Sequence, residues 1–243
     1  MPELVYPSVV GLAKTAFRAL GLRLHLEGAE HIPTSGGAVL ASNHISYVDF
    51  IFCGFATQRS KRLVRFMAKE EIFRSRLAGP LMRSMRHIPV DRSAGIASYK
   101  AALEALKGGE IVGVFPEATI SQSFMVKDIK PGAARMAAAA GVPLIPMALW
   151  GTQRMWTKGH KRRLTQRRLP ITMLIGEPMH PSRRDKQDVV AAELRRRMED
   201  LVERAQLEYP EKPAGPEDSW WLPARLGGTA PAPETLPADS AED

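Results

Sequence analysis

Residues 37–50 read GAVLASNHISYVDF, an apolar run followed by a polar turn and then a second apolar stretch. The run at 37–42 has the length and the small apolar side chains of a strand that is buried on both faces. The segment that starts at Ser46 has the S-x-x-D pattern of a helix start. This succession predicts a strand, a turn and a helix, with His44 in the turn and Asp49 at the start of the helix.

The same alternation of apolar runs and helical patterns continues along the chain. Strands are expected at 37–42, 63–68, 86–90, 110–115, 143–149 and 171–176. Helical patterns lie between them, including one at 70–85, and the longest runs from Asp188 to Leu207. Residues 1–210 are therefore predicted to form one α/β domain, in which helices flank a mixed, mostly parallel central sheet.

The two ends of the chain depart from this pattern. Apolar residues recur at helical spacing from Val10 to Leu20, so residues 1–25 are a candidate helix. The pattern suits a helix in a membrane interface and equally one packed on the body. Residues 211–243 are rich in Pro, Ala and acid, so we expect a mostly disordered tail. Its exception is Trp220–Leu222, which is apolar enough to dock on the body or on lipid.

Charge and composition narrow the location and the partners. Residues 216–243 hold one Arg and six acidic residues, which leaves a net charge of +13 on residues 1–215 out of +8 for the whole chain. Such a body favours anionic partners, namely nucleic acid, anionic lipid, phosphorylated metabolites or an acidic carrier protein. The lone Cys53 excludes an internal disulfide and is expected in the core. Without an apolar span or a signal peptide, the chain is expected on the cytoplasmic side.

His44 and Asp49 are a candidate catalytic pair. A neutral imidazole is the usual general base near pH 7, and a carboxylate on its far nitrogen fixes the tautomer and stabilises the imidazolium. The chain has no G-x-S-x-G motif for a serine nucleophile, so the pair would activate a hydroxyl of the substrate. The alternative is that Ser46 and Asp49 form a capping box and His44 is a loop residue.

Two further polar clusters follow predicted strands. Arg92 follows the strand at 86–90, and Glu117 follows the strand at 110–115. Ligands of open α/β sheets gather at the carboxyl ends of the strands, which makes both side chains candidates for substrate binding. The alternatives are a surface Arg paired with Asp91 and an acid that caps the following turn.

Together these clusters form an ordered set of motifs over residues 37–150. The set comprises N-H-x-x-x-x-D at 43–49, the Arg at 92, F-P-E-x-T-x-S at 115–121 and V-P-x-x-P at 142–146. In this order and spacing, the motifs resemble those of the glycerolipid acyltransferases, and within them the 1-acylglycerol-3-phosphate acyltransferases. The resemblance implies a glycerol-3-phosphate acyltransferase-like fold.

The resemblance also implies roles for individual residues. His44 would take the proton from the acceptor's hydroxyl, and Asp49 would hold and polarise His44. The residues implied in acceptor binding are Arg92 and Glu117, with Lys69, Lys130, Thr119 and Ser121 as further candidates. The hydroxyl would attack an acyl thioester, from acyl-CoA or acyl carrier protein, without a metal, another cofactor or a covalent acyl-enzyme. The expected product of a 1-acylglycerol 3-phosphate acceptor is phosphatidic acid.

One departure from the family pattern concerns the acceptor. Ala118 and Ile120 stand where the family usually has Gly and Arg, so a phosphate contact that the resemblance implies is absent here. Another lysolipid or glycerol 3-phosphate is therefore the alternative acceptor.

A basic segment points to a surface partner. Residues 154–168 hold seven Lys or Arg and no acid, with tryptophan nearby, which suits nucleic acid, an anionic membrane or coenzyme A phosphates. The resemblance favours an anionic membrane, so we expect a peripheral protein on the inner face of the cell membrane and no nucleic-acid partner. A non-enzymatic lipid- or nucleic-acid-binding module is the rival from another class.

Overall fold

The computed structural model describes residues 5–91 and 95–236 of the chain. Within them, seven strands form one sheet: β1 (Arg23–Glu27), β2 (Ala38–Ser42), β3 (Val64–Lys69), β4 (Ile88–Val90), β5 (Ile111–Val114), β6 (Leu144–Trp150) and β7 (Pro170–Ile175). Their order is β1-β7-β6-β2-β5-β3-β4. Neighbouring strands pair in parallel, except β6 and β7, which pair antiparallel. The prediction of an α/β domain with a mixed, mostly parallel sheet is confirmed.

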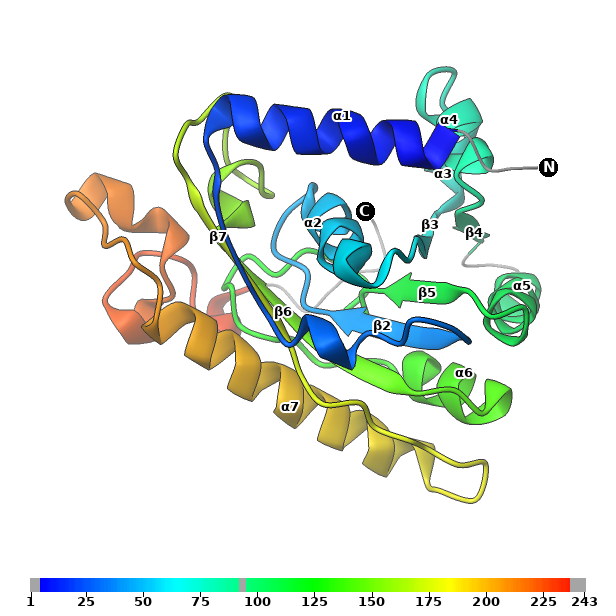
Figure 1. Cartoon of the computed structure of the whole chain (residues 1–243). Coiled ribbons are helices and arrows are strands. Elements are labelled where there is room, and N and C mark those ends of the chain that lie inside the picture. Colours follow the sequence, from blue (N-terminus) through cyan, green and yellow to red (C-terminus); the bar gives the residue numbers. More distant parts are fainter. Residues whose placement is uncertain (1–4, 92–94, 237–243) are drawn as a thin grey trace.

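Helices cover both faces of the sheet. They are α1 (Val5–Leu20), α2 (Asp49–Ala56), α3 (Glu70–Arg74), α4 (Ala78–Ser84), α5 (Gly95–Lys107), α6 (Gly132–Ala140) and α7 (Gln187–Leu207). Figure 1 shows α1 and α2 on one side of the sheet and α6 and α7 on the other. Successive residues of β2 point to opposite faces, so Leu40 joins the core under α1 and α2, while Ala41 joins the core under α5, α6 and α7. Burial on both faces explains why the central strands are continuously apolar.

The prediction of one continuous helix at 70–85 is wrong. The chain forms two short helices, α3 and α4, with Ser75 in an extended conformation between them. Pro80 explains the break, because a continuous helix would need its missing N–H and would place its ring against the carbonyl of Arg76. In α4, Pro80 lies in the first turn, where no N–H is needed.

The N-terminal prediction also needs a correction, because the helix ends at Leu20 and does not reach residue 25. Gly21 follows with a φ of 62°, and the unpredicted strand β1 then pairs in parallel with β7. The apolar stripe of α1 packs on the body, since the Phe17 ring stacks on Phe52 with ring centres 4.8 Å apart. The sequence allowed a helix in a membrane interface or a helix packed on the body. The buried side of the stripe fits a helix packed on the body.

Beyond α7, the described chain to Leu236 contains three short 3-10 helices: Pro216–Trp221, Ala224–Leu226 and Pro233–Thr235. Trp221 is fully buried in the core formed with the sheet, which confirms the expected docking of the tryptophan stretch. The division into a domain to residue 210 and a tail beyond it stays a prediction. In the described residues, no helix combines the length and the hydrophobicity needed to span a bilayer.

Candidate active site

The fold brings the turns after β2 and β5 together. These strands are parallel neighbours, with Ala38 opposite Ile111, so their carboxyl ends lie at the same edge of the sheet. The turn after β2 carries His44, and the turn after β5 carries Glu117. The two turns are joined by a backbone hydrogen bond in which the Ser121 N–H donates to the His44 carbonyl at 2.7 Å. The motifs of His44 and Glu117 therefore meet at this edge of the sheet.

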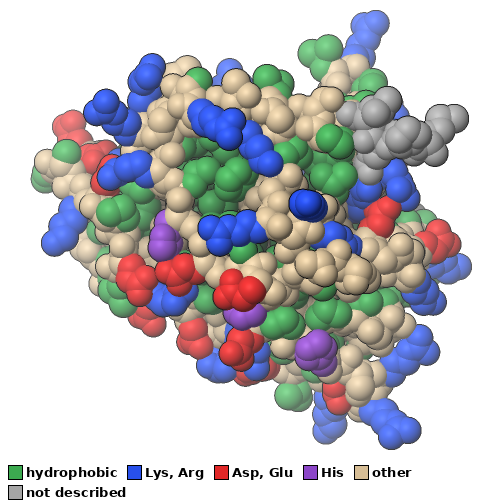
Figure 2. Space-filling model, viewed as in Figure 1, with side chains coloured by type: hydrophobic (Ala, Val, Ile, Leu, Met, Phe, Trp, Pro, Cys, Tyr) green, Lys and Arg blue, Asp and Glu red, His purple; other side chains and the backbone are tan. Residues whose placement is uncertain are grey.

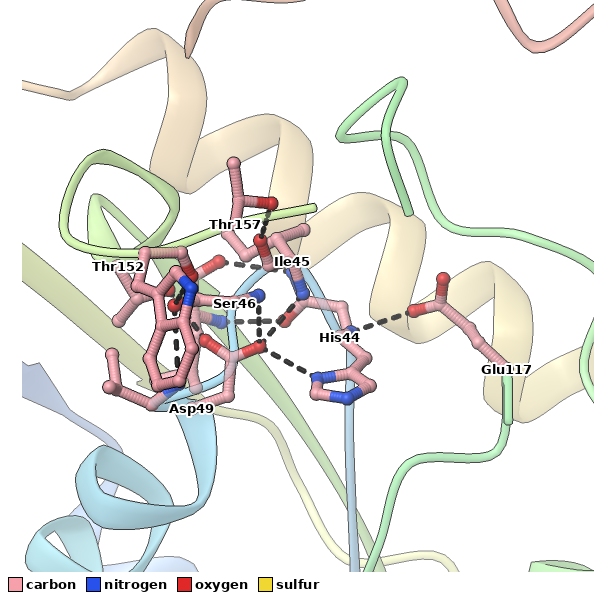
Figure 3. Close-up of polar contacts among 11 residues, drawn as sticks. His44, Ile45, Ser46, Asp49, Glu117, Thr152 and Thr157 are labelled. Carbon is pink, nitrogen blue, oxygen red and sulfur yellow. Dashed lines mark hydrogen bonds and ion pairs between the residues drawn. The ribbon is translucent and has the colours of Figure 1, made fainter. Parts of the chain in front are cut away.

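Asp49 is the centre of a hydrogen-bond network that holds the His44 imidazole (Figure 3). Its Oδ2 lies 3.0 Å from His44 Nδ1 and also accepts the N–H groups of Ile45 and Ser46, each at 2.8 Å. Its Oδ1 accepts the Thr152 hydroxyl at 2.6 Å. Because two backbone N–H groups already donate to Oδ2, this oxygen acts as an acceptor toward the imidazole as well. His44 therefore donates from Nδ1, and Nε2 carries the free lone pair.

The imidazole is fixed on one face and remains reachable. The Phe115 ring stacks against it, with ring centres 4.1 Å apart and planes 17° from parallel. The His44 side chain keeps 20% of its surface exposed, whereas Asp49 keeps none. In the described part of the chain, Nε2 has no hydrogen-bond partner, so it is available to a substrate hydroxyl.

The capping interpretation and the pairing of Asp49 with His44 are compatible, and the catalytic role of the pair stays a prediction. Asp49 is the first residue of α2 and accepts the Ser46 N–H, which is half of a capping box. The Ser46 hydroxyl accepts the Val48 N–H at 3.3 Å, not the Asp49 N–H that a full box requires, and donates to the Trp156 carbonyl at 2.6 Å. The same Asp49 oxygen that orders the turn also orients the imidazole.

Glu117 binds the turn at residues 43–48, called the catalytic turn from the predicted role of His44, on the side opposite Asp49. Its Oε1 accepts the His44 N–H at 3.0 Å, and its Oε2 accepts the Lys127 N–H at 3.2 Å. Burial raises the pKa of Glu117 to about 8, although both N–H groups and the Lys127 charge oppose this rise. Its predicted contact with the acceptor stays a prediction, because both oxygens are engaged by the backbone here.

The raised pKa of Glu117 predicts that the protein loses stability as pH rises. The folded state binds more protons than the unfolded chain between about pH 4.5 and pH 8. The contribution of Glu117 is full below about pH 4.5 and is lost as pH rises through 8. We expect the free energy of unfolding, measured with urea, to fall by roughly 1 kcal/mol per pH unit in this window. Glu117→Gln should remove that slope; an unchanged slope in the variant would contradict the assignment.

The residue after Glu117 explains the family's usual glycine. Ala118 has a φ of 65°, in the left-handed region that glycine adopts without steric cost. We expect Ala118→Gly to raise the free energy of unfolding by about 0.5–1 kcal/mol, because the relieved strain exceeds the added entropy of the unfolded chain. Urea titration measures it. Equal or lower stability of the variant would mean that the turn carries no such strain.

The other predicted acceptor residues are placed differently. The Thr119 hydroxyl accepts from Lys127 Nζ at 2.7 Å, beside Glu117. Ser121 is fully buried and its hydroxyl donates to the Met125 carbonyl at 2.7 Å. Lys69 ends β3, Lys130 is exposed, and Arg92 lies outside the described residues. Their roles in binding the acceptor stay predictions.

The sequence did not indicate that the segment after β6 contributes residues to this site. Thr152 binds Asp49, and the Thr157 hydroxyl donates to the Ile45 carbonyl at 2.7 Å, so this segment clamps the catalytic turn. The available signal was a polar G-T-Q-R stretch directly after a buried strand whose carboxyl end lies beside that of β2. Lys127, which contacts both Glu117 and Thr119, was missed as well.

The chain after α7, called the C-terminal segment (residues 208–236), holds the segment after β6 in place. Gln153 Nε2 donates to the Trp221 carbonyl at 3.2 Å. The Arg154 guanidinium lies over the Trp221 ring, 4.4 Å from its centre, and donates to Glu211 at 2.6 Å. Residues 152–154 are all buried, so chain beyond α7 is part of the structure that holds Asp49 in place.

Cys53 has no part in this site. It is 1% exposed within the core under α2, and burial raises the pKa of its thiol well above the usual range. The prediction of a core residue is confirmed. Among residues 5–91 and 95–236, no cluster of three or more His, Cys, Asp or Glu side chains is arranged to hold a metal ion.

Comparison with known proteins identifies the family. The model of the Acyltransferase family matches residues 23–150. The 1-acyl-sn-glycerol-3-phosphate acyltransferase of Bacillus subtilis is 31% identical over 69% of this chain and 82% of its own length. A chloroplastic enzyme of the same name from Arabidopsis thaliana is 30% identical over 74% of this chain, but the match spans only 49% of its length.

The fold has a solved counterpart. The crystal structure of the 1-acyl-sn-glycerophosphate acyltransferase from Thermotoga maritima superimposes with a TM-score of 0.71, covering 84% of this chain and 81% of that chain, at 24% sequence identity. The site of His44 and Asp49 lies within the residues that the family model matches. The chain belongs to the acyltransferase family and is an O-acyltransferase like the 1-acyl-sn-glycerol-3-phosphate acyltransferases.

Proposed function

We propose that the enzyme transfers an acyl chain from a thioester to the sn-2 hydroxyl of a 1-acylglycerol 3-phosphate, making phosphatidic acid for phospholipid synthesis. The observation that carries this proposal is His44, which is bound through Nδ1 to Asp49 and leaves Nε2 without a partner in the described chain. The name of the Bacillus subtilis relative supports the choice of acceptor.

The reaction needs one base and no nucleophile from the protein. His44 Nε2 removes the proton of the acceptor hydroxyl as its oxygen attacks the thioester carbonyl carbon. The buried Asp49 carboxylate stabilises the imidazolium that forms. The tetrahedral intermediate collapses, the carbon–sulfur bond breaks, and the imidazolium returns its proton to the thiolate. Because a thiol has a pKa near 8.5, the sulfur leaves with little acid assistance.

We propose Lys127 as a further cation for the phosphate of the acceptor. Its Nζ lies 2.7 Å from Thr119 Oγ1, and its backbone binds Glu117, which in turn binds the His44 N–H. The family usually has an Arg where this chain has Ile120. The Lys127 ammonium would supply the positive charge that Ile120 lacks. Lys69, Lys130 and Arg92 complete the proposed set of acceptor cations.

The thioester donor is acyl-CoA or an acyl carrier protein, and the enzyme needs no further cofactor. The chemistry at the carbonyl is the same for both donors, since each presents the acyl group on a pantetheine thiol.

We place the enzyme at the cytoplasmic face of the cell membrane as a peripheral protein. Leu77, between α3 and α4, is 90% exposed with Arg74 and Arg76 beside it, and Leu12 on the neighbouring α1 is 72% exposed. Figure 2 shows apolar side chains with Lys and Arg beside them on the face that carries α1 and α2. Exposed apolar side chains among cations suit an anionic lipid surface, where the acceptor resides.

The test compares acceptors and identifies the product. Purified enzyme is given palmitoyl-CoA or palmitoyl-acyl carrier protein with lysophosphatidic acid, glycerol 3-phosphate or lysophosphatidylcholine, and the lipids are identified by mass spectrometry. We expect phosphatidic acid from lysophosphatidic acid, with a kcat/KM at least about tenfold above the other acceptors. Preference for another acceptor would contradict the acceptor assignment and favour the alternative that Ile120 raises. Unchanged lipid or nucleic-acid binding in His44→Ala, without turnover in the wild type, would favour a binding module.

A further inference from the structure

A small pocket beside the catalytic turn has no role in the chemistry described so far. Its volume is about 320 Å³, and it lies between the loop after β6 and the C-terminal segment. The lining residues are Gly159, His160, Lys161, Arg163, Glu217 and Trp220. Two residues before Gly159, the same loop contacts the catalytic turn, where the Thr157 hydroxyl donates to the Ile45 carbonyl.

The loop that forms the pocket contacts the residue next to the predicted base. Ile45 follows His44, and two extended residues from Thr157 to Gly159 span at most about 7 Å. Gly159 also lies near Gln122, because a Cβ built on Gly159 would be 3.5 Å from Gln122 Nε2. The pocket therefore lies on a loop that contacts the turn of His44 and the segment that follows the turn of Glu117.

The pocket is held in shape by Trp220. The His160 ring stacks on it with ring centres 4.1 Å apart, and the Arg163 guanidinium lies 5.6 Å from the centre of the Trp220 ring. Trp220 is itself anchored, since the next residue, Trp221, is fully buried. An arginine supported by an aromatic ring loses less entropy on binding a ligand, and its N–H groups stay available.

The charge of the pocket favours an anion. Within the described chain, neither Lys161 nor Arg163 forms an ion pair with a carboxylate. Glu217 is the one acidic residue of the lining, so two cations face one carboxylate. Burial and the neighbouring Arg163 lower the pKa of His160, which leaves the imidazole neutral and able to donate one hydrogen bond.

We propose that this pocket binds a phosphate group at the nucleotide end of an acyl-CoA donor. The inference rests on the proposed function, because a thioester whose carbonyl lies at His44 leads its long pantetheine arm away from the base. Arg163 and Lys161 match a phosphate dianion, with Arg163 able to bind two of its oxygens. Because the His160 ring already stacks on Trp220, the proposed contact is with the phosphate and not with the base of the nucleotide. The same chemistry would hold the phosphate of a lipid headgroup, so the test separates the two sources.

The test uses two adjacent arginines as a matched pair. Arg163 lines the pocket, whereas Arg162 carries the same charge, lies over Trp156 and is outside the lining. Calorimetry of the full-length protein with adenosine 3′,5′-bisphosphate should show about tenfold weaker binding for Arg163→Gln and less than about twofold for Arg162→Gln. In turnover, Arg163→Gln should raise the KM for palmitoyl-CoA about tenfold with kcat and the KM for the acceptor unchanged.

Two results would overturn this assignment. Equal losses in both variants would mean that only the general charge of the loop matters. A raised KM for lysophosphatidic acid, or weaker binding to phosphatidylglycerol vesicles, with unchanged nucleotide binding would assign the pocket to a lipid headgroup. Binding without turnover separates this inference from the proposed function: selective loss of nucleotide binding in Arg163→Gln supports the pocket even if no acceptor is acylated.

Discussion

Replacing His44 with alanine is expected to lower kcat for acyl transfer by about 10³- to 10⁴-fold. The imidazole is the group with a free lone pair directed away from Asp49, and the described chain offers no second base in contact with it. Binding of the acceptor and donor does not depend on that lone pair, so both KM values should change little. Thiol release from the acyl thioester measures the loss.

The fold should survive this change, which makes the loss interpretable. Asp49 keeps three of its four donors when the imidazole is removed, namely Ile45, Ser46 and Thr152. His44→Asn is the matched control, since its amide can still donate to Asp49 and cannot act as a base. Both variants should unfold in urea within about 1 kcal/mol of the wild type. Activity within tenfold of the wild type in either variant would remove His44 from the mechanism.

Asp49→Asn is expected to lower kcat by about 10²- to 10³-fold while the turn keeps its shape. The asparagine oxygen can accept the three N–H groups that now bind Oδ2, and its amide can face the Thr152 hydroxyl. The tautomer of His44 is then preserved, and what is lost is the negative charge that stabilises the imidazolium. Thiol release and urea unfolding together measure the two effects.

Asp49→Ala separates the charge of Asp49 from its role in the turn. Alanine leaves the buried N–H groups of Ile45 and Ser46 without an acceptor, so the free energy of unfolding should fall by about 3–5 kcal/mol. Thr152→Val removes one donor only and should lower kcat by about tenfold or less. Equal stability of the alanine and asparagine variants would show that Asp49 does not organise the turn.

The strands at the centre of the sheet were predictable because they are buried on both faces and therefore read as continuous apolar runs. β1 was missed because its five residues, Arg23–Glu27, lie at a half-exposed sheet edge and follow the helical pattern closely, with Gly21 as the stop signal between them. The split of α3 and α4 was signalled by Pro80, which the periodicity of the surrounding apolar residues outweighed.

The site was predictable where its contacts are local. His44 and Asp49 are five residues apart, so the strand–turn–helix pattern was sufficient to pair them. The bond from His44 to Glu117 spans 73 residues, and the bond from Thr152 to Asp49 spans 103. Such contacts depend on which strands pair, and one sequence does not specify that order. The ordered motifs of the family supplied Glu117, but they contain nothing for Thr152.

The central claim is that His44 activates the acceptor hydroxyl for direct attack on the thioester. The most direct measurement is a single turnover of palmitoyl-CoA or palmitoyl-acyl carrier protein with excess enzyme, with thiol release and the intact mass of the protein followed before and after addition of lysophosphatidic acid. We predict negligible thiol release and no acylated protein until the acceptor is added, then phosphatidic acid equimolar with thiol, and neither product with His44→Ala. A burst of thiol with acylated protein before the acceptor is added, or equal turnover by His44→Ala, would contradict the claim.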